Sequence, residues 1–151
     1  MSLEDRIARL EDREAIRELR ARYCYRIDAR AYDDFADLFT DDAQLDFGPV
    51  GTFEGRDEVR EFAADVVGAE HPFLAHMVHN PIIHVDGDEA TGRWYFEVPC
   101  TFSDGNAGWI QGTYHDEYRR EDGEWLIAAI AADFNYFADY EEGWAAIVGD
   151  G

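Results

Sequence analysis

Four histidines lie close together in the middle of this chain, and imidazole can both bind a transition metal and carry a proton near neutral pH. They are His71, His76, His79 and His84. None of them forms the His-x-His or helical His-x-x-x-His pair that is typical of a zinc site. In an extended segment His76 and His79 would point to opposite faces, and Pro81 interrupts the run. We therefore expect no metal centre.

Other reactive groups and cofactor motifs are scarce. The two cysteines, Cys24 and Cys100, have no Cys-x-x-Cys spacing, so we expect free, buried thiols and neither a disulfide framework nor a zinc ribbon. The sequence has no glycine-rich phosphate loop, no nucleophile elbow and no dinucleotide-binding fingerprint. We therefore expect no cofactor, and Ser-His-Asp hydrolysis is disfavoured.

The charge of the chain excludes several kinds of partner. Its 151 residues include 34 Asp and Glu against 13 basic residues, all of them arginine, which gives a net charge of −21. Such a charge repels nucleic acid and anionic membranes. No segment reaches the roughly 20 apolar residues of a membrane span, and the charged N-terminus does not resemble a signal peptide. We expect a cytoplasmic protein.

The first part of the sequence has helical periodicity. From Leu3 to about Arg30 apolar residues recur at spacings of three and four. The stripe comprises Leu3, Ile7, Leu10, Ile16, Leu19, Tyr23 and Ile27. Its N-terminal part could pack against a second subunit. A short helix around Tyr32–Phe39 and a strand at Ala43–Phe47 follow.

A further helix is expected from Gly55 to Gly68. Gly55 and Glu58 have the spacing of a reciprocal N-terminal cap, and Gly68 is well placed to end the helix. Between them Val59, Phe62, Ala63 and Val66 form one apolar face.

From Phe73 onward the period changes to two, which indicates half-buried strands. Trp94, Phe96, Val98, Cys100 and Phe102 alternate with more polar residues, and the last two strands are expected at Gly108–Arg120 and Glu124–Phe137. Helices followed by antiparallel hairpins indicate an α+β fold. With 46% hydrophobic residues, one domain over residues 1–151 has ample core material.

Several local signatures occur in a characteristic order. They are Arg22-Tyr23 through Asp28, Tyr32-Asp33-Asp34-Phe35, Leu38 to Ala43, Phe53 to Val59, His76 to Pro81, Gly92-Arg93-Trp94-Tyr95 and Gly123-Glu124-Trp125. In this order the chain resembles the SnoaL-like branch of the nuclear transport factor 2-like superfamily over about residues 5–144. The resemblance implies a cone-shaped α+β barrel, with N-terminal helices in the concave face of a strongly curved mixed or antiparallel sheet.

The resemblance leaves two functions open, because the superfamily includes both enzymes and non-catalytic proteins. One is a cofactor-independent lyase or isomerase, dehydratase- or cyclase-like, acting on a small, largely apolar oxygenated molecule. The other is a non-catalytic ligand-binding or assembly-stabilising subunit, like the small subunit of a ring-hydroxylating dioxygenase. In either case the resemblance implies a homo-oligomer, dimer or trimer.

The resemblance to scytalone dehydratase singles out Asp28 and His76 as an acid–base pair. A carboxylate can orient one imidazole nitrogen and leave the other to move a proton. The alternatives are that Asp28 is a helix-terminal carboxylate or a partner of Arg26, and that His76 is a core histidine. By resemblance to ketosteroid isomerase, Tyr23 is a candidate hydrogen-bond donor, with packing between helix and sheet as the alternative. Asp46 is expected to face solvent.

The chain also departs from the dehydratase pattern. Where that family has a second histidine after a Val-Pro step, Cys100 follows Val98-Pro99. Ile27, Gly112 and Tyr114 stand where it has a tyrosine, a serine and an asparagine. The expected pocket lining is aromatic and favours an apolar ligand. It comprises Phe53, Trp94, Phe96, Cys100, Tyr114 and Tyr136, with Trp144 as part of the lining or of a lid.

The acidic, lysine-free composition leads to a prediction about salt. It favours adaptation to a salt-loaded cytoplasm, because at molar salt the Debye length of about 3 Å screens carboxylate repulsion; arginine usage in a GC-rich genome is the alternative. We expect the urea midpoint of unfolding, followed by circular dichroism, to rise between low and molar KCl. A midpoint that falls would contradict the halophilic interpretation.

Overall fold

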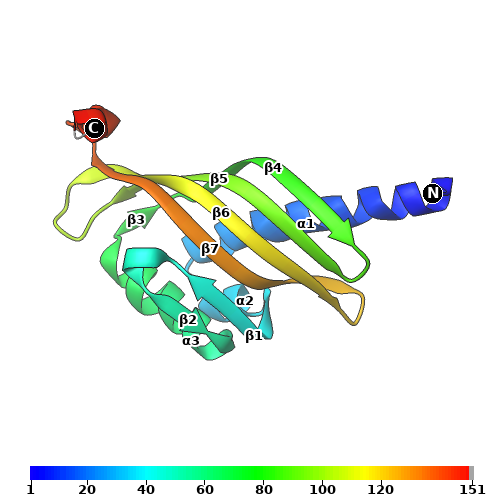
Figure 1. Ribbon diagram of the computed structural model, residues 1–151. Helices are drawn as coiled ribbons and strands as arrows, with labels where there is room; N and C mark the ends of the chain where they lie inside the picture. Colours follow the sequence, from blue (N-terminus) through cyan, green and yellow to red (C-terminus); the bar gives the residue numbers. More distant parts are fainter. Residues whose placement is uncertain (150–151) are drawn as a thin grey trace.

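The computed structural model describes residues 1–149 and consists of a curved sheet wrapped along a long helix (Figure 1). The helices are α1 (Leu3–Asp28), α2 (Tyr32–Ala36) and α3 (Gly55–Glu61), the last continued by a π-helical segment, Phe62–Gly68. Short 3₁₀ segments lie at Gly48–Val50 and Gly143–Gly149. The strands are β1 (Phe39–Asp46), β2 (Thr52–Glu54), β3 (Phe73–Leu74), β4 (Met77–Asp86), β5 (Glu89–Thr101), β6 (Ala107–Glu121) and β7 (Glu124–Asp139).

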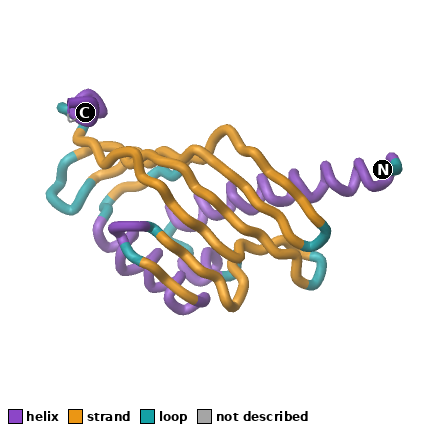
Figure 2. The backbone as a smooth tube through the Cα atoms, viewed as in Figure 1, coloured by secondary structure: helices purple, strands orange, loops and turns teal. Residues whose placement is uncertain are grey.

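The strands form one mixed sheet of seven strands, in the order β2-β1-β7-β6-β5-β3, with β4 also paired to β5. Figure 2 shows them as a continuous curved layer. All pairs are antiparallel except β1 with β7. The α+β prediction with N-terminal helices inside a curved mixed sheet is confirmed.

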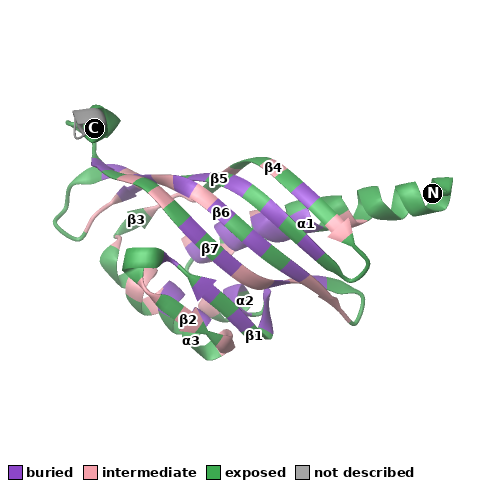
Figure 3. Cartoon of the chain, viewed as in Figure 1, coloured by how far each residue is buried: buried purple, intermediate pink, exposed green. Residues whose placement is uncertain are grey.

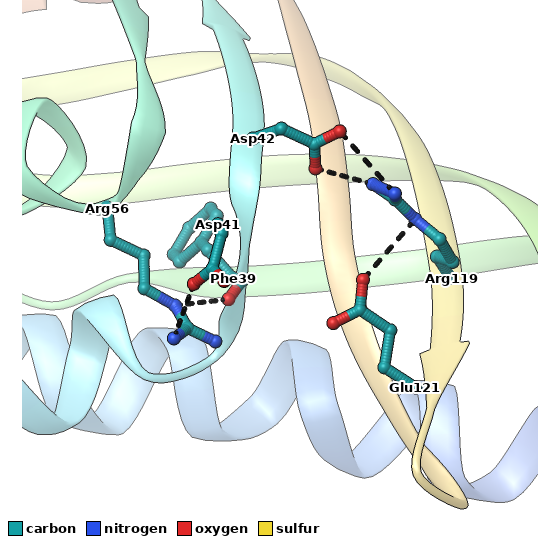
Figure 4. Close-up of polar contacts among 6 residues, drawn as sticks. All are labelled: Phe39, Asp41, Asp42, Arg56, Arg119 and Glu121. Carbon is teal, nitrogen blue, oxygen red and sulfur yellow. Dashed lines mark hydrogen bonds and ion pairs between the residues drawn. The ribbon is translucent and has the colours of Figure 1, made fainter.

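The parallel strand β1 begins irregularly and is held by arginines from two other elements. Its register against β7 shifts between Phe39 and Gln44. In Figure 4, Arg56 donates to the Phe39 carbonyl at 2.8 Å and pairs with Asp41, also at 2.8 Å. Arg119 from β6 pairs with Asp42 at 2.6 Å. Exposed pairs of this kind contribute only about 0–1 kcal/mol each. They connect the start of β1 to α3 and β6.

Helix α1 is buried in its second half only. Ile16, Leu19, Tyr23 and Ile27 are buried as the periodicity predicted, whereas the first turns extend beyond the sheet and are exposed (Figure 3). In those turns the apolar side chains of Leu3, Ile7 and Leu10 face solvent. Among residues 1–149 no helix combines the length and the apolar character that crossing a membrane requires.

The third helix differs from its prediction at both ends. Its N-cap is Glu54 and not Gly55, and the Glu58 carboxylate accepts from the Glu54 backbone N–H at 2.7 Å. The α-helix ends at Glu61, and the chain continues to Gly68 as a π-helix. π-Helical turns are rare and occur often at functional sites. Gly68 packs closely against Tyr32, and a Cβ there would overlap the Tyr32 hydroxyl unless that side chain moved.

A buried ion pair joins α1 to the centre of the sheet. Arg20 donates from Nε and Nη2 to the Asp116 carboxylate at 3.0 and 3.1 Å, and both side chains are completely buried. Tyr118 donates its hydroxyl to Asp116 at 2.5 Å and accepts from the Trp94 indole at 2.9 Å. The pair is therefore part of a four-residue network linking α1, β5 and β6.

The electrostatics of this pair contain two opposing tendencies. Burial is the largest single influence on the Arg20 guanidinium and acts to lower its pKa, but Asp116 together with Tyr23, Tyr114 and Tyr118 outweighs it, so the pKa lies above its ordinary value. Burial also raises the pKa of Asp116, although Arg20 and Tyr118 act to lower it. The first shift favours the ionised pair and the second opposes it. Because three hydrogen bonds satisfy the Asp116 carboxylate, we take the pair as ionised at neutral pH.

Removing one partner is expected to destabilise the fold strongly. Asp116→Asn leaves the Arg20 cation buried without a counter-charge, which costs about 3–5 kcal/mol. The double variant Arg20→Met/Asp116→Leu should recover most of this loss, because it buries neither charge. Urea unfolding curves of the three proteins measure both effects.

The matched control is Asp42→Asn, which breaks an exposed arginine–aspartate pair. Its free energy of unfolding should change by no more than about 1 kcal/mol. If Asp116→Asn changed stability as little as Asp42→Asn, Asp116 would be neutral in the folded protein and the ion pair would be refuted.

Candidate active site

Asp28 and His76 are joined by two hydrogen bonds. Asp28 is the last residue of α1, and His76 directly precedes β4. The His76 ring Nδ1 lies 2.6 Å from Asp28 Oδ1, and the His76 backbone N–H donates to Oδ2 at 2.9 Å. The side chains are 9% and 25% exposed for His76 and Asp28 respectively. Arg26 donates instead to the Asp34 carbonyl, at 2.6 Å, and so is not the partner of Asp28.

This geometry determines which imidazole nitrogen is available. A carboxylate accepts hydrogen bonds, so the Nδ1 atom of His76 carries the proton that it shares with Asp28. The Nε2 atom is left to accept a proton from another molecule. A negative side chain at the C-terminus of a helix is disfavoured by the helix dipole, and the two donors from His76 compensate for that position.

His76 lines an apolar cavity of about 230 Å³ between the helices and the concave face of the sheet. Its walls are mainly aromatic and aliphatic side chains, and its polar groups are few. The lining includes Tyr23, Phe47, Phe62, Val66, Val67, Leu74, Phe96, Val98, Phe102, Ile110, Tyr114, Phe134 and Phe137, with Glu70, His71 and His76. An apolar cavity with a few convergent polar groups is typical of a small-molecule site.

Two tyrosines belong to the lining of this cavity. Tyr23 and Tyr114 both line it, and their rings lie edge to face, with centroids 6.3 Å apart. Burial raises the pKa of Tyr23 to about 12 and that of Tyr114 well above its ordinary value. Both hydroxyls therefore stay protonated at neutral pH and can donate hydrogen bonds.

The Arg20 guanidinium packs on the rings of these two tyrosines. Its guanidinium carbon lies 4.2 Å from the centroid of the Tyr23 ring and 4.0 Å from that of Tyr114. Its Nη1 atom has no hydrogen-bond acceptor among residues 1–149. The faces of the two rings compensate through cation–π attraction of about 0.5–2 kcal/mol each. The ion pair thus sets the positions of both phenols.

Six residues were predicted to line the pocket, and two of them, Phe96 and Tyr114, do so, with their rings stacked at 4.0 Å. The structure corrects the prediction for Trp94 and Cys100. Trp94 points toward Tyr118, deeper in the core, because its indole needs a hydrogen-bond acceptor. Cys100 is buried opposite Gly108 on β6, and burial raises the pKa of its thiol to about 11.

Phe53 and Tyr136 also lie outside the cavity lining. Phe53 packs on Phe62, with centroids 4.8 Å apart, and faces a separate groove. On β7 the neighbours Phe134 and Phe137 line the cavity, while Tyr136 contacts Trp144, which is 57% exposed. A register shift opposite Gln111 and Gly112 interrupts the alternation of β7 in this region, so simple strand parity did not identify the lining residues.

The separate groove is larger, about 1130 Å³, and lies on the opposite face of the sheet. Its side chains come from positions that alternate with core residues, such as Arg93, His115 and Glu117. Neither Asp28 nor His76 is among its lining residues. We therefore take the smaller cavity, which His76 lines, as the candidate active site.

Sequence reasoning missed several residues of the site, and some signals were present. Arg20 lies four residues after Ile16 and three before Tyr23, on the buried stripe of α1. Asp116 has the strand parity of the buried Tyr114 and Tyr118. A charged residue on each buried face suggests an ion pair. Within residues 1–149 no three His, Cys, Asp or Glu side chains are grouped so as to hold a metal ion.

Comparison with known proteins places this geometry in a family. Residues 8–131 match the SnoaL-like domain family. The chain belongs to that family. Its fold is the cone of the nuclear transport factor 2-like superfamily. An uncharacterized protein of Mycobacterium tuberculosis is 35% identical over 98 residues. These residues are 64% of this chain and 66% of that protein, so the match spans slightly less than two thirds of the relative's length.

Relatives with a named activity match over more of the chain. Hexachlorocyclohexane dehydrochlorinase 1 of Sphingobium indicum is 28% identical over 133 residues, which are 85% of each chain. The crystal structure of the dehydrochlorinase LinA superposes with a TM-score of 0.84 and 26% identity, covering 88% of this chain and 92% of LinA. This family therefore includes lyase-like relatives with the same architecture.

Proposed function

We propose that this protein is a cofactor-independent lyase that eliminates a leaving group from a small, largely apolar, oxygenated molecule. The observation that carries the proposal is the Asp28–His76 pair, with one imidazole nitrogen bound to the carboxylate and the ring lining an apolar cavity. The family membership supports a reaction of this class, since the name of one relative denotes removal of hydrogen chloride from hexachlorocyclohexane.

The proposed reaction begins with proton transfer. His76 Nε2 takes the proton from the carbon next to a carbonyl group, and the electron pair of that C–H bond forms a new carbon–carbon double bond. The leaving group departs with the electron pair of its own bond to carbon. Asp28 stabilises the imidazolium that results, because it already accepts the Nδ1 proton. This pair acts as a base without a metal or an organic cofactor.

Tyr23 is proposed as the group that stabilises negative charge on the substrate. Its hydroxyl is protonated at neutral pH, since burial raises its pKa to about 12. Its ring lies 6.2 Å from the His76 ring, edge to face. A phenol donor beside the base favours the enolate-like charge that develops on a carbonyl oxygen as the proton leaves.

The Asp28–His76 pair is tested with a chromogenic elimination substrate, 4-(4-nitrophenoxy)butan-2-one. Asp28→Asn and His76→Ala should each lower kcat/KM by about 100-fold or more, because general acid–base catalysis contributes about 10²–10⁴. Release of 4-nitrophenolate is followed by its visible absorbance and compared with the rate in buffer.

The control is His79→Ala, since His79 is an exposed histidine near the same strand end that pairs with Glu97 outside the cavity. It should retain wild-type turnover. If the wild-type protein turns the substrate over and both Asp28→Asn and His76→Ala retain that activity, the proposed base is refuted. If the wild-type protein shows no turnover at all, the result favours the non-catalytic alternative.

We also propose that the protein forms a homo-oligomer. The exposed Leu3, Ile7 and Leu10 of α1 and the groove on the outer face of the sheet support this proposal, since both are surfaces that a second copy could cover. Light scattering in molar KCl should give a dimer or trimer mass, and a monomer at micromolar concentration would contradict the proposal.

A further inference from the structure

A second histidine, His71, lines the same cavity as His76. It is partly buried, and its ring lies 6.0 Å from the ring of Phe102, another residue of the lining. It follows the π-helical segment, from which Val66 and Val67 also line the cavity. The cavity therefore contains two imidazole rings from two different segments of the chain.

One ring nitrogen of His71 is engaged with the backbone. Its Nδ1 atom lies 3.0 Å from the Val67 carbonyl oxygen. Because a carbonyl oxygen only accepts hydrogen bonds, Nδ1 carries a proton and donates it. The Nε2 atom is then the one that can hold or release a proton, the same arrangement that Asp28 imposes on His76.

The backbone that carries His71 is clamped by Arg30. The Arg30 guanidinium donates to the carbonyls of Gly68 at 2.7 Å, His71 at 2.9 Å and Pro72 at 3.3 Å. Arg30 itself follows the end of α1 with a φ of +59°, in the left-handed region where helix termini usually have glycine. A non-glycine residue there costs about 1–2 kcal/mol, so the three contacts of its side chain compensate for local strain. They join the segment of His71 to the helix end that carries Asp28.

An elimination that expels hydroxide or an alkoxide needs a proton for the departing oxygen. In this cavity His76 is already the base. Tyr23 and Tyr114 hold their protons tightly, because burial raises both pKa values. Glu70 is exposed. Since the other polar groups of the lining are excluded, His71 is the remaining group that can give a proton to the leaving oxygen.

We infer that His71 is the general acid of the proposed elimination, and that the natural leaving group is an oxygen that must be protonated. This inference rests on the proposed function. As His76 Nε2 takes the carbon-bound proton, the C–H electrons form the double bond and the C–O bond breaks with its electrons on oxygen. The oxygen receives the Nε2 proton of the His71 imidazolium and leaves as water or an alcohol. Transfer through solvent then returns one proton from His76 to His71.

Two substrates that differ only in the leaving group test this inference. In 4-phenoxybutan-2-one the departing phenoxide is strongly basic and benefits from a proton, whereas 4-nitrophenoxide in 4-(4-nitrophenoxy)butan-2-one leaves without one. His71→Asn keeps a donor for the Val67 carbonyl and removes the Nε2 position. Its kcat/KM should fall about 100-fold for the phenoxy compound and less than about threefold for the nitrophenoxy compound.

Two further variants separate proton transfer from simple contact. His71→Gln keeps a hydrogen-bond donor near the Nε2 position but no transferable proton, so its loss on the phenoxy compound should resemble that of His71→Asn. His79→Asn, outside the cavity, should match the wild type on both compounds. A His71→Asn protein with equal losses on the two compounds, while turnover still depends on His76, overturns this inference and leaves the proposed function standing.

A measurement without turnover provides a second test. Histidine ring ¹⁵N resonances are recorded as 4-nitrophenol is added, and the inference requires that the Nε2 resonances of His71 and His76 both shift. A His71 resonance that stays constant while that of His76 shifts overturns the inference. If neither compound is turned over and neither resonance shifts, the proposed function fails and the inference fails with it.

Discussion

The buried Arg20–Asp116 ion pair is the constraint on which the rest of this structure depends. It fixes one turn of α1 against the centre of β6, with both charges inaccessible to water. Eight residues further along the same helix lies Asp28, about 12 Å away at the rise of an α-helix. The cation also packs on the Tyr23 and Tyr114 rings. A single buried pair therefore positions both phenols of the cavity and aligns the helix that ends at the acid–base pair.

Two locally unfavourable features meet at the end of that helix. Asp28 places a negative charge at a helix C-terminus, where the dipole disfavours it, and Arg30 occupies the left-handed region usually reserved for glycine. Each is compensated by contacts with the segment around His71 and His76. Departures from local preference tend to gather at functional sites. Here they gather beside His71 and His76, the only histidines among the described residues that line the smaller, apolar cavity.

Much of the fold was predictable, because each element follows from a local pattern. The apolar stripe from Ile16 to Ile27 predicted the buried face of α1, and the alternation from Trp94 to Cys100 predicted the core face of β5. The pocket lining was harder to predict. Parity shows which side of a strand is buried but not how far along it a cavity lies, so Phe96 lines the cavity whereas Trp94 and Cys100, on the same face of β5, do not. In β7 a register shift interrupts the alternation next to Tyr136, so parity does not predict the position of Tyr136 relative to the cavity.

The sequence by itself determined the class of the fold, the acidic surface and the candidate acid–base residues, because periodicity, charge and motif order are local properties of the chain. Only the tertiary structure decided which groups meet. The hydrogen bonds of His76 to Asp28 span 48 residues, and the Arg20–Asp116 pair spans 96. It also decided that the segment of His71 lies against the end of α1, since the contact of Arg30 with the His71 carbonyl joins segments about 40 residues apart. Contacts at such separations depend on how the curved sheet closes over α1, and no local pattern encodes that geometry.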